Sequence, residues 1–352
     1  MKTKEYYMTK LFDRFLKDSY KGKRLKANGN RIKHQTIRNY EYVLSYLVMF
    51  EQKQQAPIRI RVFKGNNKRE FLTEKKYWAK FYQDFTSFLY KEKNCYDNYV
   101  GMITKTIRVF FGYLNRELGI VTGDFYKSFY VCQEEIPIIT LMPEQLNFLI
   151  NDNQFKHSLS RPLEKARNIF IFGCTVGLRI SDLFVTKFSD IEYTGGCYYL
   201  PVKTIKTASR VRIKLPGYAM DIIREFRKSA KGRKTIFPPV PPTRFNNQIK
   251  SLAELAGWTH QISKTRNKRG RSEETLFSET GRAYRFCDLV SSHTMRITAI
   301  TTMLMLGMKE HVVKQISGHT NDSKSFYRYV NFVQSYVDNE MDRVFEELGK
   351  IV

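Results

Sequence analysis

Residues 190–216, which read DIEYTGGCYYLPVKTIKTASRVRIKLP, carry the pattern that most restricts the fold. Three short runs rich in Tyr, Val and Ile are separated by Gly195-Gly196 and by the segment IKTAS. Such runs between tight turns predict three successive strands of an antiparallel sheet. Helical periodicity precedes and follows this stretch, so the sequence predicts a mainly α-helical protein with a small antiparallel sheet.

The chain before this stretch predicts a helical module and then a second domain. Helices are expected over residues 2–18, 35–52, 73–93 and about 97–118. The segment QEEIPIITLMPEQLNFLI then reads as a linker and a new helix opened by Pro143. We therefore expect two domains, residues 1–135 and residues 136–352. The basic stretch SKTRNKRGRSEE, residues 263–274, interrupts the helices of the second domain and predicts an exposed loop.

The charge of the chain indicates the class of its partner. There are 60 Lys and Arg residues against 34 Asp and Glu, which gives a net charge of +26 spread over both expected domains. A positive field of that extent favours nucleic acid, because binding a long polyanion releases its condensed counterions. Arg38, Lys105 and Arg108 lie between apolar helix residues, which suits phosphate contact and equally suits a solvated face.

The cysteines and the N-terminus restrict the compartment. The five cysteines are scattered, without a CxxC pair or a Cys/His cluster at metal-ligand spacing, which argues against a disulfide framework and against a zinc site. The stretch MKTKEYYMTKLFDRF is charged where a signal peptide needs an apolar core, and no window approaches about 18 uninterrupted apolar residues. We expect a soluble cytoplasmic protein without a membrane segment.

Two pieces of the second domain place polar residues beside apolar helix sequence. In NIFIFGCTVGLRISDL an apolar helix ends, and Arg179 and Asp182 follow three residues apart; alone, they could be a surface ion pair. In SSHTMRITAITTML, His293 and Arg296 share one face at the start of a helix, where an anion can bind. Ser292 could equally cap that helix, with the other two as incidental neighbours.

A third piece, SGHTNDSKSFYRYV, places His319 ahead of two tyrosines, Tyr327 and Tyr329. On its own, the histidine could cap a helix and the tyrosines could be half-buried helix residues. Together with the other two pieces, however, the set comprises two arginines, two histidines and a tyrosine. Those groups make chemical sense around one phosphodiester.

Arginine forks can bind both non-bridging oxygens of a phosphodiester and neutralise the charge that grows at phosphorus. A cationic, partly desolvated setting lowers the pKa of a tyrosine hydroxyl from about 10 and favours its attack. The leaving 5′-oxygen needs a proton, which a lysine on a hairpin turn can supply. Lys206 is the candidate and Lys203 the competitor; we prefer Lys206 because it lies closer to the expected turn. No metal ion or other cofactor is required.

In their order and spacing, these pieces resemble the tyrosine recombinase (phage integrase) family over residues 172–330. The resemblance implies a C-shaped clamp on DNA, with a helical, SAM-like core-binding domain followed by a mixed α/β catalytic domain. It implies that Arg179 and Arg296 hold the scissile phosphate and that His293 assists proton movement. It also implies that His319 hydrogen-bonds a phosphate oxygen and that Asp182 supports the site.

The position of the nucleophile departs from the family pattern, in which the tyrosine usually lies nine positions after the second histidine. Here Tyr329 lies ten positions after His319 and Tyr327 lies eight positions after it. We favour Tyr329, because KSFYRY resembles the endings of related integrases and one extra residue in TNDS restores the register; Tyr327 stays the alternative. Attack by Tyr329 would leave a 3′-phosphotyrosine and a free 5′-hydroxyl, and the reverse attack could join new strands.

The resemblance also suggests partners. It implies double-stranded DNA with specific core sites, a homo-tetramer on paired sites and a nucleoid-associated location, and it leaves room for accessory DNA-bending proteins. A C-terminal helix is expected from about residue 331, with one apolar face: Val333, Val337, Met341, Val344 and Leu348. It could cover its own core, or it could dock onto a neighbouring protomer.

The leading interpretation is a site-specific DNA recombinase that performs integration, excision or inversion. One alternative is a type IB topoisomerase, which shares this chemistry but relaxes DNA without exchanging partners. The other is a DNA-binding protein with an inactive site. Dependence on paired DNA sites separates the first two.

Overall fold

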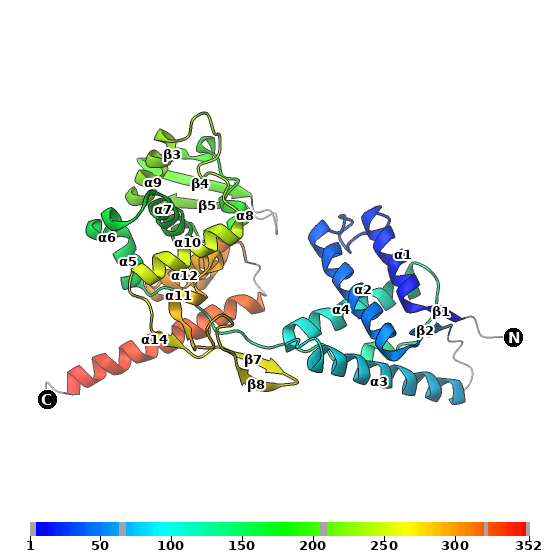
Figure 1. Cartoon of the computed structure of the whole chain (residues 1–352). Coiled ribbons are helices and arrows are strands. Elements are labelled where there is room, and N and C mark those ends of the chain that lie inside the picture. Colours follow the sequence, from blue (N-terminus) through cyan, green and yellow to red (C-terminus); the bar gives the residue numbers. More distant parts are fainter. Residues whose placement is uncertain (1–4, 63–67, 204–209, 320–322, 350–352) are drawn as a thin grey trace. The chain divides into compact units, whose positions relative to one another are not determined.

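The computed structural model describes residues 5–62, 68–203, 210–319 and 323–349. Contacts divide the chain into two compact units. Unit 1 comprises Met1–Ile136 with Thr265–Thr275, and unit 2 comprises Pro137–Lys264 with Leu276–Val352. Helices dominate both units, and every sheet in the described residues is small and antiparallel (Figure 1). The predicted fold class is therefore confirmed.

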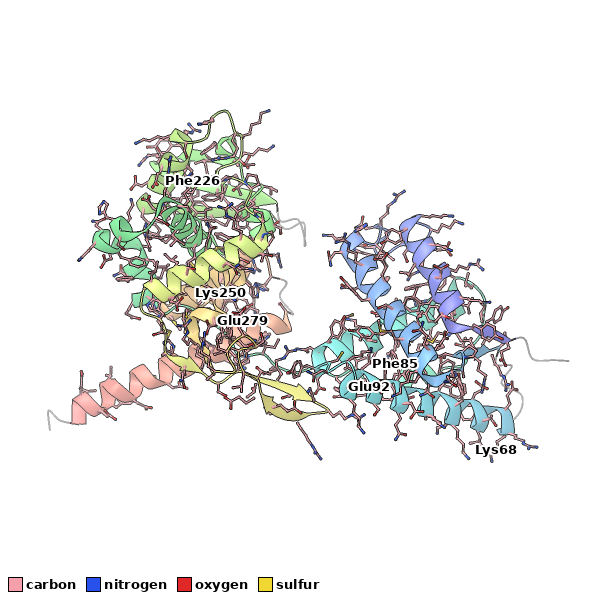
Figure 2. All side chains as sticks on the ribbon, in the orientation of Figure 1. Lys68, Phe85, Glu92, Phe226, Lys250 and Glu279 are labelled. Atoms are coloured by element: carbon pink, nitrogen blue, oxygen red, sulfur yellow. The ribbon has the colours of Figure 1, made fainter. Side chains whose placement is uncertain are left out.

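Unit 1 is built on four helices: α1 (Met8–Tyr20), α2 (His34–Gln54), α3 (Lys68–Lys91) and α4 (Asp97–Arg116). A short 3₁₀ helix follows at Phe125–Ser128. The first helix begins later than residue 2, because β1 (Glu5–Tyr7) pairs antiparallel with β2 (Arg59–Arg61). Aromatic side chains such as Phe85 fill the core between the helices, whereas Lys68 and Glu92 are exposed (Figure 2).

A β-hairpin far along the sequence also belongs to unit 1. Strands β7 (Thr265–Lys268) and β8 (Arg271–Glu274) pair where the sequence predicted an exposed loop, so that prediction is wrong. One ion pair and two backbone hydrogen bonds hold the hairpin against the rest of unit 1. Arg266 binds Glu134 at 2.7 Å, and the backbone N–H groups of Arg269 and Gly270 donate to Asp97 at 2.8 and 2.9 Å. The charge of Arg266 neutralises the buried Glu134 carboxylate, and backbone N–H groups of the hairpin turn bind the buried Asp97 carboxylate.

Unit 2 begins with α5 (Pro143–Asn151), α6 (Asn153–Ser158), α7 (Arg161–Val176) and α8 (Ile180–Leu183). A short 3₁₀ helix at Phe188–Asp190 leads to the predicted sheet of β3 (Glu192–Thr194), β4 (Cys197–Lys203) and β5 (Arg210–Leu215), in the order β3-β4-β5. Gly195 and Gly196 have φ values of +58° and +75°, which a tight hairpin turn requires. The three-strand prediction is confirmed.

The rest of unit 2 is again mostly helical. It contains α9 (Gly217–Lys228), α10 (Pro242–Leu255), α11 (Phe286–Leu289), α12 (Ser292–Met305), α13 (Glu310–Ser317) and α14 (Lys324–Gly349), and β6 (Gln261–Ile262) pairs with β9 (Tyr284–Arg285). Helix α7 lies at the centre and contacts α9, α10 and α12. Its apolar residues form one core with side chains such as Phe226 of α9 (Figure 2).

Helix α14 starts at Lys324, earlier than the predicted start near residue 331. The segment carrying both candidate tyrosines is therefore helical. The C-terminal turns of α14 project from the rest of unit 2 (Figure 1), and Met341, Val344, Phe345 and Leu348 are about half exposed there. None of the helices in the described ranges combines the length and apolar character needed to cross a membrane.

Candidate active site and nucleic-acid interface

The close approach of α7 and α12 places Arg296 at the end of α7. A Cβ atom at Gly173 would overlap the Met295 side chain, so only glycine permits this packing distance. Arg296 is 3% exposed, and its Nη1 donates to the carbonyl of Gly177 at 2.9 Å. This bond ties the first turns of α12 to the residue that ends α7.

Arg179 follows directly after that end. Gly177 adopts a left-handed conformation with φ of +64°, which stops α7 and lets the chain turn so that Arg179 caps α8. The Nη1 atom of Arg179 is buried and has no hydrogen-bond partner in the described part of the chain. Asp182, 1% exposed, donates its backbone N–H to the Arg179 carbonyl at 2.9 Å. A buried guanidinium nitrogen without an acceptor can donate a hydrogen bond to an oxygen atom of a ligand.

A helix cap positions His319. Gly318, with φ of +63°, ends α13, and the N–H of His319 donates to the carbonyl of Lys314 at 2.9 Å. This pairing belongs to a Schellman cap, which turns the chain back across the last helical turn. The imidazole then lies 3.3 Å from Nη2 of Arg296, with Nδ1 2.8 Å from the hydroxyl of Ser317.

The partners of His319 select one form of its ring. Arginine can only donate, so Arg296 requires an unprotonated ring nitrogen. The Ser317 hydroxyl donates to the Val313 carbonyl at 2.6 Å, so it accepts from Nδ1–H, which leaves Nε2 as the acceptor for Arg296. Burial, followed by the charges of Arg296, Arg179 and Lys314, lowers the pKa of His319 to about 4. The imidazole is therefore neutral near pH 7.

The electrostatics of Arg296 show how strongly positive the site is. Burial, followed by the charge of Arg179, lowers the pKa of this guanidinium from 12.5 to about 10. Tyr329 and Asp182 act in the opposite direction and raise it. Two guanidinium groups within electrostatic reach of each other repel, so the site favours a ligand that carries negative charge.

The structure distinguishes the two candidate tyrosines. Tyr329 is 8% exposed, and its ring centre lies 6.1 Å from that of His319 and 6.2 Å from that of Phe326. Tyr327 is 49% exposed, with Nζ of Lys314 4.7 Å from its ring centre. Residues two apart on a helix point to different sides. Only Tyr329 of this pair contacts the arginine–histidine group.

Three other predicted residues, His293, Lys206 and Lys203, are not part of this arginine–histidine–tyrosine arrangement as far as the structure describes it. His293 lies in the first turn of α12, one turn before Arg296, with an exposed side chain. Ser291 rather than Ser292 is the N-cap of this helix. Lys206 lies outside the described residues, and Lys203 is the last residue of β4. The structure thus brings together Arg179, Asp182, Arg296, His319 and Tyr329.

Sequence reasoning missed two supporting groups. The Ser317 hydroxyl orients the imidazole and the Gly177 carbonyl orients Arg296. Ser317 directly precedes the Gly-His pair and could have been proposed from its position. The Gly177 carbonyl could not, because every residue has a backbone carbonyl and the sequence does not show which one accepts a hydrogen bond. Across the described ranges, no three His, Cys, Asp or Glu side chains gather as metal ligands would.

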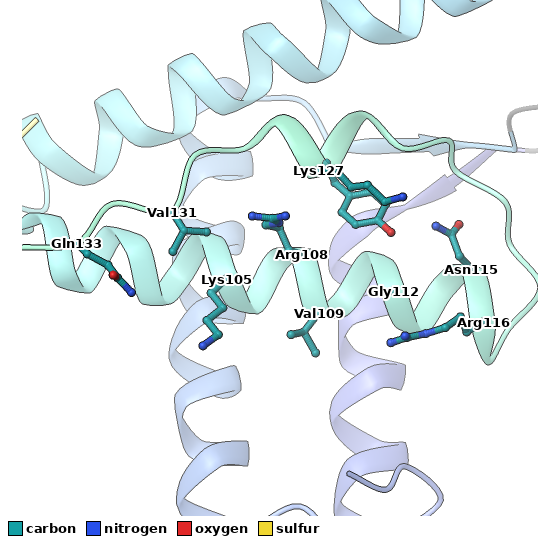
Figure 3. A pocket seen from close by; sticks show the side chains of 10 residues that line it. Lys105, Arg108, Val109, Gly112, Asn115, Arg116, Lys127, Val131 and Gln133 are labelled. Carbon is teal, nitrogen blue, oxygen red and sulfur yellow. The ribbon is translucent and has the colours of Figure 1, made fainter. Parts of the chain in front are cut away.

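Unit 1 carries a basic groove along α4. It has a volume of about 680 Å³, and its lining side chains include Lys105, Arg108, Arg116 and Lys127 (Figure 3). Lys127 is paired with Asp124 at 2.7 Å. Gly112 lies between the α4 cations in the groove (Figure 3), although glycine destabilises an exposed helix by about 1 kcal/mol relative to alanine. The guanidinium of Arg116 lies over Gly112, with Nη2 3.1 Å from where a Cβ atom would be, so the missing side chain leaves room for this cation.

The sequence model of the Phage integrase family matches residues 157–334. This range contains every residue of the group around Tyr329. No curated protein sequence matches the chain.

Solved structures resemble more than nine-tenths of the chain, among them the following three. A lambda integrase dimer bound to a COC′ core site has a TM-score of 0.58 and 16% identity, over 92% of this chain and 77% of that chain. XerH site-specific recombinase bound to palindromic difH substrate has a TM-score of 0.57 and 13% identity, over 91% of this chain and 80% of that chain. The Tn1549 transposon integrase with transposon right end DNA has a TM-score of 0.57 and 15% identity, over 96% of this chain and 99% of that chain. At such identities, the likeness shows the fold.

Proposed function

Because this chain belongs to the phage integrase family, we propose that it is a site-specific DNA recombinase that cuts and rejoins strands through a tyrosine–DNA phosphodiester. The observation that carries this proposal is the convergence of two arginines and a neutral histidine on a buried tyrosine, Tyr329. Each of these groups has a role in transferring a phosphoryl group between two oxygens.

The scissile phosphate would bind between Arg179 and Arg296. The free Nη1 of Arg179 and the Nη2 of Arg296 can donate to its non-bridging oxygens, and the anion would relieve the repulsion between the two guanidinium groups. These donors also stabilise the charge that grows on the oxygens as the phosphorus becomes five-coordinate. When Arg296 turns to the phosphate, Nε2 of His319 becomes free to accept a proton.

In the cleavage step, the Tyr329 oxygen bonds to phosphorus and the bond from phosphorus to the 5′-oxygen breaks. The phenolic proton can pass to neutral His319, directly or through water, and the departing oxygen gains a proton and becomes a 5′-hydroxyl. We assign the second proton to Lys206, on sequence grounds alone, with Lys203 as the alternative. Because one phosphodiester replaces another, attack by a 5′-hydroxyl of a partner strand reverses the step and completes an exchange.

The surroundings of the site supply DNA binding and assembly. The α4 groove of unit 1 gathers cations without acidic lining residues, as contact with a phosphate backbone requires. The exposed apolar residues at the end of α14 suit docking onto a second copy. One related structure is a lambda integrase tetramer bound to a Holliday junction. We propose a tetramer on paired sites here, with a domain boundary near residue 135 and the two domains closing as a clamp on DNA.

The test uses a nicked suicide duplex, selected from a random-sequence pool for tight binding. Cleavage near the nick releases a short fragment, so religation fails and the covalent adduct accumulates. The wild-type chain should form an adduct that survives denaturing electrophoresis. Tyr329→Phe should abolish it. Tyr327→Phe is the matched control, because it removes a hydroxyl two residues away on the same helix, and it should retain the adduct.

The outcomes separate the alternatives. Loss of the adduct only in Tyr327→Phe would reverse the nucleophile assignment. An adduct that leads to relaxation of single-site plasmids but never to exchange between paired sites would indicate a topoisomerase. If no adduct forms on any selected duplex, the chain is a DNA-binding protein without strand transfer.

A further inference from the structure

A second basic cavity lies in unit 2, away from the group around Tyr329. It has a volume of about 470 Å³ and lies between the first half of α7, the start of α10 and the segment 229–241. Four cationic side chains line it, with no acidic residue among the lining side chains: Arg161, Lys165, Lys231 and Arg244. Ala166, Ile169 and Val240 supply apolar surface.

Several other cations of unit 2 have acidic partners. Arg224 pairs with Asp221, Arg282 with Asp288 and Lys156 with Glu164. Within the described ranges, no hydrogen bond or ion pair engages the side chain of Arg161, Lys165, Lys231 or Arg244. Arg161, Lys231 and Arg244 are exposed, so water screens their mutual repulsion, but together the four cations give the cavity a positive potential that attracts an anion.

The cavity has a rigid wall. Pro238, Pro239 and Pro241 restrict the backbone, and the guanidinium of Arg233 donates to the carbonyls of Thr235 and Ile236 at 2.8 and 2.9 Å. The adjoining Ile236 and Phe237 are fully buried. A site that keeps its shape without ligand loses little conformational entropy on binding.

Helix α7 separates this cavity from the proposed scissile-phosphate site. Arg161 is the first residue of α7 and Val176 its last, which places the two ends about 22 Å apart at 1.5 Å per residue. Along a duplex, that length corresponds to about six base-pair steps. One duplex is long enough to place phosphates at both sites.

We infer that the cavity lined by Arg161, Lys165, Lys231 and Arg244 is a second phosphate-binding site, which holds the DNA backbone away from the scissile phosphate. The inference rests on the proposed DNA recombinase function. Arginine forks match phosphate oxygens bidentately, and an all-cation lining without an acid provides no contact specific to a base. The site anchors DNA regardless of sequence and takes no part in bond breaking.

The test compares two double variants that remove the same charge. Arg161→Gln with Lys165→Gln removes two lining cations. Lys228→Gln with Lys309→Gln is the control, because both lysines are exposed, neither lines the cavity, and Lys228 lies just before the lining Ser229. Affinity for a short random-sequence duplex is measured by fluorescence anisotropy over a series of salt concentrations.

The cavity variant should weaken binding and reduce the slope of log K against log salt by about one unit for each phosphate that the protein no longer neutralises. The control should keep the wild-type slope. An equal slope change in both variants would overturn the inference, because the effect would then be net charge alone. Adduct formation on the selected duplex at saturating protein should be unchanged in both, which separates failure here from failure of the recombinase proposal.

Two further arms identify the anion. Inorganic pyrophosphate that binds the wild type but not the cavity variant, with an unchanged DNA slope, would overturn the assignment to the DNA backbone and assign the phosphate site to a free phosphate compound. A synthetic peptide of the acidic C-terminal residues 337–349 that binds only the wild type, again with an unchanged DNA slope, would overturn the inference in favour of docking by a second copy.

Discussion

The neutral state of His319 yields a prediction with a calculable magnitude. Burial and the neighbouring cations lower its pKa from 6.5 to about 4. Between these two values, the unfolded chain binds a proton that the folded chain does not, so protonation favours unfolding. The contribution of this imidazole to stability is therefore complete above pH 6.5, and it is lost as pH falls toward 4.

The pKa difference corresponds to at most about 3 kcal/mol in the free energy of unfolding. The imidazole is only half-buried, and solvent screens part of the repulsion, so we expect about 1–2 kcal/mol. His319→Gln removes the titrating group and keeps a polar side chain. As pH falls from about 7 to about 4.5, the wild type should lose about 1–2 kcal/mol more in free energy of unfolding than this variant loses.

Two measurements check this value. Urea unfolding at the two pH values gives the difference in stability, with His311→Gln as the control, because it removes an exposed histidine from α13. An NMR titration of the histidine ring protons gives the pKa directly, and the signal missing from His319→Gln is that of His319. A His319 signal that titrates near 6.5 would refute the argument that two guanidinium groups surround a desolvated ring.

Three other changes test neighbouring parts of the account. Arg296→Met should abolish the covalent adduct yet alter the free energy of unfolding by less than about 2 kcal/mol, because the lost bond to a carbonyl is offset by no longer burying a charge disfavoured by about 3 kcal/mol; a larger loss in urea unfolding would contradict this. Gly173→Ala should destabilise by about 1–3 kcal/mol, because its Cβ would overlap Met295, and should reduce adduct yield by shifting α12; unchanged adduct yield would show that the helix spacing is not critical. Arg108→Gln with Arg116→Gln should lower the salt slope of duplex binding by about one to two units, and an unchanged slope would remove the α4 groove from the DNA interface.

The sequence predicted the helical elements and the three-strand sheet well, because both depend on local periodicity and turn chemistry. The errors arose where distant residues decide the local structure. Residues 5–7 form a strand because Arg59–Arg61 lie beside them, and the segment 263–274 forms a hairpin because Glu134 and Asp97 bind it. The sequence of each segment alone does not show which distant residues it contacts.

The candidate site was predicted by residue type and order, but its electrostatics required coordinates. The pattern of Arg179, Arg296 and His319 predicted a phosphate site. The structure adds a lowered pKa for His319 and an Nη1 atom of Arg179 that has no hydrogen-bond partner among the described residues. The choice between Tyr329 and Tyr327 depended on an uncertain spacing in the sequence. It becomes a geometric difference once α14 is seen to begin at Lys324 and to face only one of them toward His319.

Mapping the covalent adduct shows whether Tyr329 is the residue that becomes esterified to a DNA phosphate. Trypsin cleaves after Lys324, Arg328 and Arg343, which separates Tyr327 from Tyr329. After nuclease treatment of the adduct, mass spectrometry should find the residual nucleotide on the peptide that begins at Tyr329, with fragment ions placing it on that first residue. A nucleotide on the peptide that contains Tyr327, or on Tyr336, would contradict the account.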